Sequence, residues 1–323
     1  MYTNKILIVK IFGVGNAILL SPSIKAYKEL HSESVIDIVM ENRCKGLWDN
    51  WNLINKIYYY DPRQIKSCID ELIHKQYDLL FLSPPVNHIF DSLIPIAKRH
   101  IVPSYEMPYQ WEADINFNVV KRCGYASDIP TGYVDVSETD YKKKYGDYII
   151  IHIGAIDEAG HENKMYPLDK FAKICDLINQ THHFPFVFIG TNKEFSMLSI
   201  LRSLIKTKIE IIDLCNALTL PELASLTKTA RLYIGNDSGP LHVASVMGCP
   251  VIGIYGPTPL EKSKPLHPYP ERLLRIHRHN TVDCAPCYLQ FSKMVSCQNR
   301  VCFDIEPEYI SREAIKLLDK PLF

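Results

Sequence analysis

The 323-residue sequence lacks an excess of either charge. It has 36 Lys and Arg residues against 36 Asp and Glu residues, so the formal net charge is zero. Proteins that bind bulk DNA or RNA by neutralising phosphates are basic, and we therefore expect no nucleic-acid partner. A local basic stretch at residues 262–279 is either a solvated face or a surface for an anionic membrane or a phosphorylated acceptor.

Long hydrophobic runs and a secretory leader are also missing. The most apolar stretch, residues 6–20, is interrupted by Lys10 and Asn16 and is shorter than the roughly 20 residues of a membrane-spanning helix. Ten cysteines are too dilute for a disulfide framework, so we expect a cytoplasmic protein with reduced thiols. With 47% hydrophobic residues, the chain can bury the cores of about two domains.

Short β-branched runs alternate with longer helical patterns, which predicts an α/β fold. A strand at residues 6–11, a glycine loop and a helix near residues 16–31 open the chain. The same order restarts after the polar stretch 137–145 with a near-continuous apolar strand at 148–154. Such strands are typical of a parallel sheet that is covered on both faces.

This alternation predicts two domains. We place the first at residues 1–145 and the second, doubly wound, at residues 146–303, followed by a last helix within residues 304–323. In doubly wound sheets, ligands bind at the carboxyl ends of the strands.

The segment 233–244 ends a strand, turns on a glycine and opens a helix with a proline in its first turn. The N–H groups of Ser238 and Gly239, together with the helix dipole, predict a site for a phosphate or pyrophosphate. His242 lies one helical turn further and is placed to add a hydrogen bond. The alternative is an ordinary helix with Asp237 or Ser238 as its cap.

Residues 237–242, followed by 248–251 and 255–258, resemble the signature of the bacterial heptosyltransferases, glycosyltransferase family nine. Further segments resemble that family in its own order, so the likeness covers nearly the whole chain. They are residues 5–10, 13–16, 20–22, 154–155, 164–167, 218–223 and 284–287.

The resemblance implies the GT-B fold, in which two Rossmann-like doubly wound domains face each other across a cleft. It places the acceptor on the first domain and a nucleotide-diphosphate sugar on the second, with the C-terminal helix packing back toward the first. The implied activity is inverting transfer of a sugar, such as heptose from ADP-heptose, to a lipopolysaccharide core or another surface-glycan or lipid-linked acceptor. It also implies catalysis without a metal or other cofactor, with a peripheral contact to the inner membrane as one further expectation.

Three other functions stay open beside this one. They are transfer of the sugar to a protein, binding of a sugar nucleotide without catalysis, and epimerisation of a sugar nucleotide.

The family's site residues are transferred to this chain position by position. Glu194 resembles a glutamate that meets the donor ribose, although a glutamate at a helix start also has a simple dipole explanation. Lys164 is the cation expected to stabilise the diphosphate, and Gly13 and Gly15 are expected at the acceptor. The remaining donor-binding residues are Gly154, Asp237, Ser238, Gly239, Leu241 and His242.

Direct displacement needs a base to take the proton of the acceptor hydroxyl. The family has an aspartate for this purpose at the position of Asn16, and an amide cannot take a proton as a carboxylate does. Either another group is the base, or Asn16 only positions the acceptor, or the protein is impaired. The candidate substitutes in expected cleft loops are Glu106, His152, Asp157 and Glu158.

Four late cysteines lie close together in the sequence: Cys284, Cys287, Cys297 and Cys302. Their clustering suits a structural zinc or iron site, and some related protein-modifying heptosyltransferases hold iron with such a cluster. Only nine residues separate the two pairs, which is short for a zinc ribbon. Reduced free thiols are the alternative.

Overall fold

The computed structural model describes residues 4–11, 13–84, 88–103, 110–155 and 161–321. The chain forms two compact units, Met1–Asp135 and Val136–Phe323. The expected boundary at residue 145 is therefore too late. Helix α4 (Tyr141–Tyr145) lies in the second unit, where it contacts helix α7 (Leu220–Thr229), because the buried ring of Tyr141 belongs to that unit.

The first unit is a sheet of five parallel strands in the order β3-β2-β1-β4-β5. Its strands are β1 (Lys5–Lys10), β2 (Val35–Glu41), β3 (Lys56–Tyr60), β4 (Tyr77–Ser83) and β5 (Ala97–Ile101). Its α-helices are α1 (Val14–Leu30), α2 (Ile65–Leu72) and α3 (Glu112–Arg122).

Successive residues of β1 are buried on opposite faces of this sheet, as strand geometry requires. Leu7 and Val9 share a core with Leu72 of α2. Ile6 and Ile8 face a small apolar cavity that is also lined by residues of α1 and α3. Helices therefore cover both faces, which explains why β1 reads as a continuous apolar run.

The second unit is a sheet of six parallel strands in the order β11-β10-β9-β6-β7-β8. Its strands are β6 (Ile149–His152), β7 (Phe186–Gly190), β8 (Ile211–Cys215), β9 (Leu232–Asn236), β10 (Val251–Tyr255) and β11 (Leu273–His277). Beside α4 and α7, its α-helices are α5 (Leu168–Asn179), α6 (Asn192–Leu204), α8 (Gly239–Val246), α9 (Phe291–Val295) and α10 (Pro307–Leu318). Short 3-10 helices in the two units are η1 (Asn42–Cys44), η2 (Pro62–Gln64), η3 (His88–Ile96), η4 (His161–Lys164), η5 (Pro270–Arg272) and η6 (Val301–Phe303).

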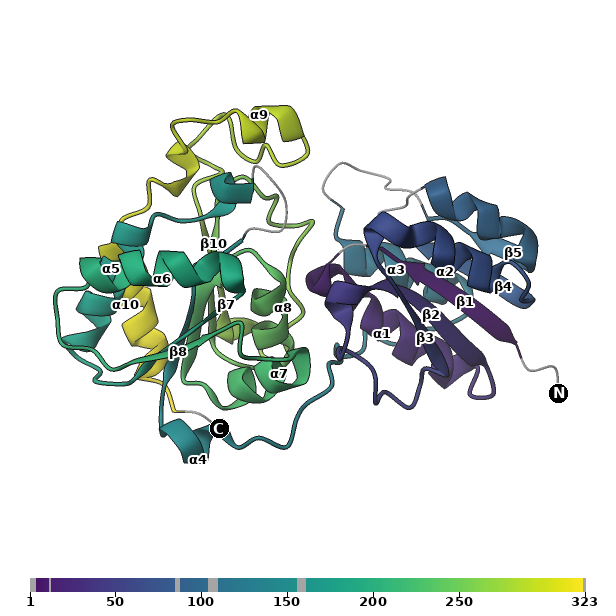
Figure 1. The fold of residues 1–323 in the computed structure, drawn as a ribbon, viewed down its shortest axis with the longest axis horizontal. Coiled ribbons are helices and arrows are strands. Elements are labelled where there is room, and N and C mark those ends of the chain that lie inside the picture. Colours follow the sequence, from purple (N-terminus) through teal and green to yellow (C-terminus); the bar gives the residue numbers. More distant parts are fainter. Residues whose placement is uncertain (1–3, 12, 85–87, 104–109, 156–160, 322–323) are drawn as a thin grey trace. The chain divides into compact units, whose positions relative to one another are not determined.

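Helices α5, α6 and α10 cover one face of the second sheet, and α7 and α8 cover the other (Figure 1). The expectation that residues 304–323 pack toward the first domain is corrected here. Ile310, Ala314 and Leu318 of α10 are buried in the core of the second unit, where α10 packs on α5. Their spacing of four residues puts these three side chains on one helix face, which this core buries.

Within the described ranges, no helix is both long and apolar enough to cross a membrane.

Candidate functional site

The strand order of the second sheet reverses between β6 and β9, and polar residues lie at the carboxyl ends of both strands. His152 ends β6 and Asn236 ends β9. His152 is paired with Gly235, where a Cβ would come within 2.9 Å of the His152 carbonyl oxygen. The absent side chain at Gly235 lets the two strands approach. This reversal point is where open α/β sheets bind their ligands.

Helix α8 begins at this point without a side-chain cap. Ser238 occupies the N-cap position, but its hydroxyl shares a hydrogen bond with His152 Nδ1 (3.1 Å) and donates to the Asn236 carbonyl oxygen (3.0 Å). Helices α6 and α7 of the same unit, by contrast, both begin with a capping box. The side-chain-capped alternative is therefore wrong for α8. Its first N–H groups and the positive end of its dipole remain available to an anion.

Lys164 supplies a cation beside this helix start. Its Nζ lies 3.9 Å from Asp237 Oδ2 and 5.0 Å from the centre of the Tyr288 ring, and the Lys164 and Asp237 side chains are 10% and 9% exposed. An ammonium group has three N–H donors. Lys164 can therefore bind an anion while it stays close to Asp237.

His242 lies in the second turn of α8 and is buried. Burial lowers the pKa of His242 to about 4; the charge of Lys164 adds to this shift and that of Asp237 opposes it. The imidazole is therefore neutral near pH 7. Its Nδ1 is buried without a hydrogen-bond partner in the described part of the chain.

Asn236 holds the loops around this site together, a role that sequence reasoning missed. Its side chain accepts a hydrogen bond from Tyr166 N (2.9 Å) and donates to the carbonyl oxygens of Ile153 (2.8 Å) and Gly154 (3.3 Å). These bonds connect the end of β6 to the loop that carries Lys164. The available sequence signal was a polar residue at the end of an apolar strand.

Glu194 and Gly154 lie against each other. Glu194 Oε2 accepts hydrogen bonds from the N–H and the hydroxyl of Thr191, both at 2.6 Å, which completes the capping box of α6. A Cβ on Gly154 would come within 2.1 Å of Glu194 Oε1. Glu194 therefore has a structural role in the capping box of α6, and contact with a donor ribose stays a prediction for the oxygen that faces Gly154.

The cysteine-rich segment, residues 284–303, packs on the loop that carries Lys164. Asn163 Nδ2 donates to the Met294 carbonyl oxygen (2.9 Å), and Arg300 Nη1 donates to that of Met165 (3.5 Å). The ring of Tyr288, from the same segment, lies next to the ammonium of Lys164. This segment therefore supports the position of the lysine.

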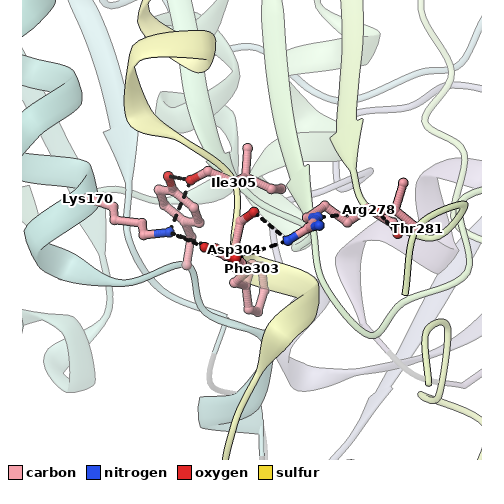
Figure 2. Close-up of polar contacts among 7 residues, drawn as sticks. Lys170, Arg278, Thr281, Phe303, Asp304 and Ile305 are labelled. Carbon is pink, nitrogen blue, oxygen red and sulfur yellow. Dashed lines mark hydrogen bonds and ion pairs between the residues drawn. The ribbon is translucent and has the colours of Figure 1, made fainter. Parts of the chain in front are cut away.

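The C-terminal end of that segment is fixed to the body of the second unit (Figure 2). Arg278 Nη1 donates to the Asp304 carbonyl oxygen (2.9 Å) and to Asp304 Oδ2 (3.1 Å). On the other side, Lys170 Nζ donates to the carbonyl oxygens of Phe303 and Ile305, both at 3.2 Å. Residues 303–305 are therefore held by two cations, Arg278, which follows β11, and Lys170 of α5.

The four late cysteines are neighbours, but they do not form a metal-ligand set. Burial and the other three thiols, Cys284, Cys287 and Cys297, raise the pKa of Cys302 to about 11. Cys297 Sγ donates to Asn299 Oδ1 at 3.6 Å. In the residues that the structure places, no group of three or more His, Cys, Asp or Glu side chains is arranged to hold a metal. All four are free thiols in this structure, and a zinc or iron site formed by them stays a prediction.

In the first unit, Asn16 lies in the first turn of α1, which follows β1. Its Nδ2 donates to Glu112 Oε2 at 2.8 Å. Gly13 is the N-cap of α1 and Gly15 is buried within its first turn. Sequence reasoning missed the partner of Asn16, because Glu112 is distant in the chain and opens another helix.

Of the expected substitute bases, the structure places one. His152 is buried and bonded to Ser238. Glu106, Asp157 and Glu158 lie outside the described residues.

The family model for glycosyltransferase family 9 (heptosyltransferase) matches residues 119–290, which is more than half of the chain. The chain belongs to glycosyltransferase family 9. It is a glycosyltransferase with the GT-B fold, two Rossmann-like domains built on parallel sheets.

Individual relatives agree with this assignment. The family 9 chain is 26% identical to lipopolysaccharide heptosyltransferase 1 of Campylobacter coli over 294 residues, which cover 79% of this chain and 84% of the relative. A family 9 glycosyltransferase structure from Veillonella parvula superposes with a TM-score of 0.79 at 18% identity and 98% coverage of both chains. The structure of E. coli ADP-heptose LPS heptosyltransferase II gives a TM-score of 0.72 at 16% identity, over 97% of this chain and 98% of that one.

Proposed function

We propose that this family 9 member transfers a heptose from ADP-heptose to a lipopolysaccharide core or another surface-glycan acceptor, with inversion at the sugar carbon. The observation that carries the proposal is the uncapped start of α8 beside Lys164. Support for the donor comes from the ADP-heptose named for the E. coli neighbour, and support for the acceptor from the lipopolysaccharide named for the Campylobacter relative.

The proposed mechanism places the donor diphosphate at the start of α8. The acceptor oxygen bonds to the sugar carbon and gives its proton to a base other than the Asn16 amide, while the bond from that carbon to the phosphate oxygen breaks and the diphosphate leaves with the electron pair. The α8 N–H groups together with Lys164 stabilise the charge that grows on the diphosphate. These groups are held in place by bonds within the second unit. Lys164 lies beside Tyr288 on a loop that is bonded to Asn236, and Ser238 at the helix start is bonded to His152 and to the Asn236 carbonyl oxygen. Because two sources of positive charge already face the leaving group, we propose metal-independent catalysis.

A second function is favoured by one observation, the amide at position 16. If no group takes the acceptor proton, the chain binds sugar nucleotides without transferring the sugar.

Mass spectrometry of acceptors distinguishes the two functions. The purified protein would be incubated with ADP-heptose, UDP-sugars or GDP-sugars and with truncated lipopolysaccharide cores, with and without a chelator. The proposal expects an acceptor that gains one heptose from ADP-heptose alone, equally in both conditions. Donor binding by calorimetry without any glycosylated product would contradict the proposal and favour the second function.

A further inference from the structure

The reversal point of the first sheet contains a chain of polar side chains from three elements. The strand order changes direction between β1 and β4. Lys10 ends β1, Asn16 lies in the first turn of α1 and Glu112 opens α3. Lys10 Nζ donates to Glu112 Oε1 and to the carbonyl oxygen of Pro84, which follows β4. This edge of a doubly wound sheet, at the carboxyl ends of its strands, is where ligands bind.

The carboxylate of Glu112 joins the other two side chains. One of its oxygens accepts from the Lys10 ammonium and the other from Asn16 Nδ2 at 2.8 Å. Lys10 and Glu112 are 1% and 2% exposed, and burying either charge alone would be costly. Burial lowers the pKa of Lys10, and the charge of Glu112 opposes that shift. The ion pair therefore places a carboxylate oxygen of Glu112 next to Asn16.

This carboxylate fixes which way the Asn16 amide points. An ionised carboxylate only accepts hydrogen bonds, so a flipped amide would bring two oxygens together. Asn16 Nδ2 must face Glu112, and Asn16 Oδ1 faces away from it. Asn16 is half-buried, unlike Lys10 and Glu112. A ligand at this edge of the sheet would therefore meet the half-buried Asn16 amide before the buried Lys10 and Glu112.

A second polar side chain of α3 lies near the end of β4. Asn116 lies one helical turn after Glu112, and its Oδ1 accepts a hydrogen bond from Ser83 Oγ at the end of β4 (2.8 Å). Its Nδ2 is completely buried and has no partner among the described side chains and backbone. Buried polar groups are normally satisfied, and the Asn116 Nδ2 is an unpaired donor among the described residues.

We propose that Glu112 is a positioning residue of the acceptor site, which holds the Asn16 amide so that Oδ1 accepts a hydrogen bond from the attacking hydroxyl of the sugar acceptor. This rests on the proposed transferase function. Donation of the Asn16 N–H to a carboxylate polarises the amide and makes its oxygen a stronger acceptor. Lys10 donates to the other oxygen of this carboxylate and so holds Glu112 in place.

Exchange of the amide and the carboxylate tests this role. The side-chain amide introduced by E112Q has one oxygen that accepts and one NH2 group that donates. It therefore cannot accept hydrogen bonds from both Lys10 and Asn16. N16D instead places two carboxylates in contact. We expect each single variant to raise the KM for the acceptor at least tenfold, with the KM for the donor within twofold of the wild type. In N16D/E112Q the new amide donates to the new carboxylate and still accepts from Lys10, and the acceptor KM is expected to return to within about threefold of the wild type.

The matched control is E71Q, which removes the carboxylate of an exposed ion pair with Lys56 in the same unit. It should leave both KM values unchanged. An unchanged acceptor KM in E112Q would overturn the role of Glu112, as would an equal rise in the donor KM. If E112Q does not fold, the acceptor KM of N16D is compared with that of N16D/E112Q. A double variant whose acceptor KM stays as high as that of N16D would also overturn the role of Glu112. A wild-type protein that transfers no sugar to any acceptor would refute the proposed function, and this role with it.

Discussion

The buried His242 should make the stability of this glycosyltransferase sensitive to acid. In the folded protein, burial lowers the pKa of His242 to about 4, whereas the imidazole of an unfolded chain has a pKa of about 6.5. The unfolded chain therefore binds the proton more tightly. The contribution of the neutral, buried His242 to the free energy of unfolding is therefore fully present above about pH 6.5 and is lost as the pH falls toward 4. The difference of about 2.5 pKa units corresponds to an upper limit of roughly 3 kcal/mol.

Urea denaturation at about pH 8 and about pH 5 measures this effect in the wild type and in H242Q. At about pH 5 the linkage relation gives a loss of about 2 kcal/mol in the free energy of unfolding from His242 alone. The wild type should therefore lose about 2 kcal/mol more than H242Q between the two pH values. H74Q, which changes an exposed histidine, should lose as much as the wild type. Equal losses in the wild type and H242Q would show that His242 does not make the stability sensitive to acid.

Three further predictions concern the second unit. K164M removes the ammonium beside the start of α8 and should lower kcat by about a hundredfold in the transfer assay, because one electrostatic donor to the leaving group is lost; a change under threefold would contradict that role. E194A and E222A each break a capping box and should each cost about 1 kcal/mol in urea denaturation, but only E194A, next to Gly154, should weaken ADP binding in calorimetry. N236A leaves buried backbone groups of the loops unpaired and should cost about 2–4 kcal/mol, and a loss below 1 kcal/mol would count against its bracing role.

The sheet architecture could be predicted from the sequence, because buried parallel strands are continuous apolar runs. The strand expected at residues 148–154 is β6, and the helix expected after the glycine turn is α8. The domain boundary was wrong because the polar stretch 137–145 looks like a linker, while the ring of Tyr141 is buried in the second unit. The packing of α10 was wrong for a related reason. Its apolar face shows that it is buried but not which sheet buries it.

The candidate site was predictable only where it is local in sequence. The helix start at Ser238 and Gly239 is contained in one short motif. The contact of Asn16 with Glu112 joins residues 96 positions apart, and no pattern along the chain connects them. Neither does sequence spacing show that Ser238 would turn its hydroxyl to His152 and leave the helix uncapped. Such contacts depend on how the strands are ordered in the sheet.

The proposed mechanism requires the donor diphosphate to bind at the start of α8 in the second unit. A crystal structure of the protein soaked with ADP would show where the diphosphate binds. We expect phosphate oxygens within hydrogen-bond distance of the backbone N–H groups of Ser238 and Gly239 and of Lys164 Nζ. A diphosphate bound elsewhere, with these groups out of its reach, would contradict this mechanism.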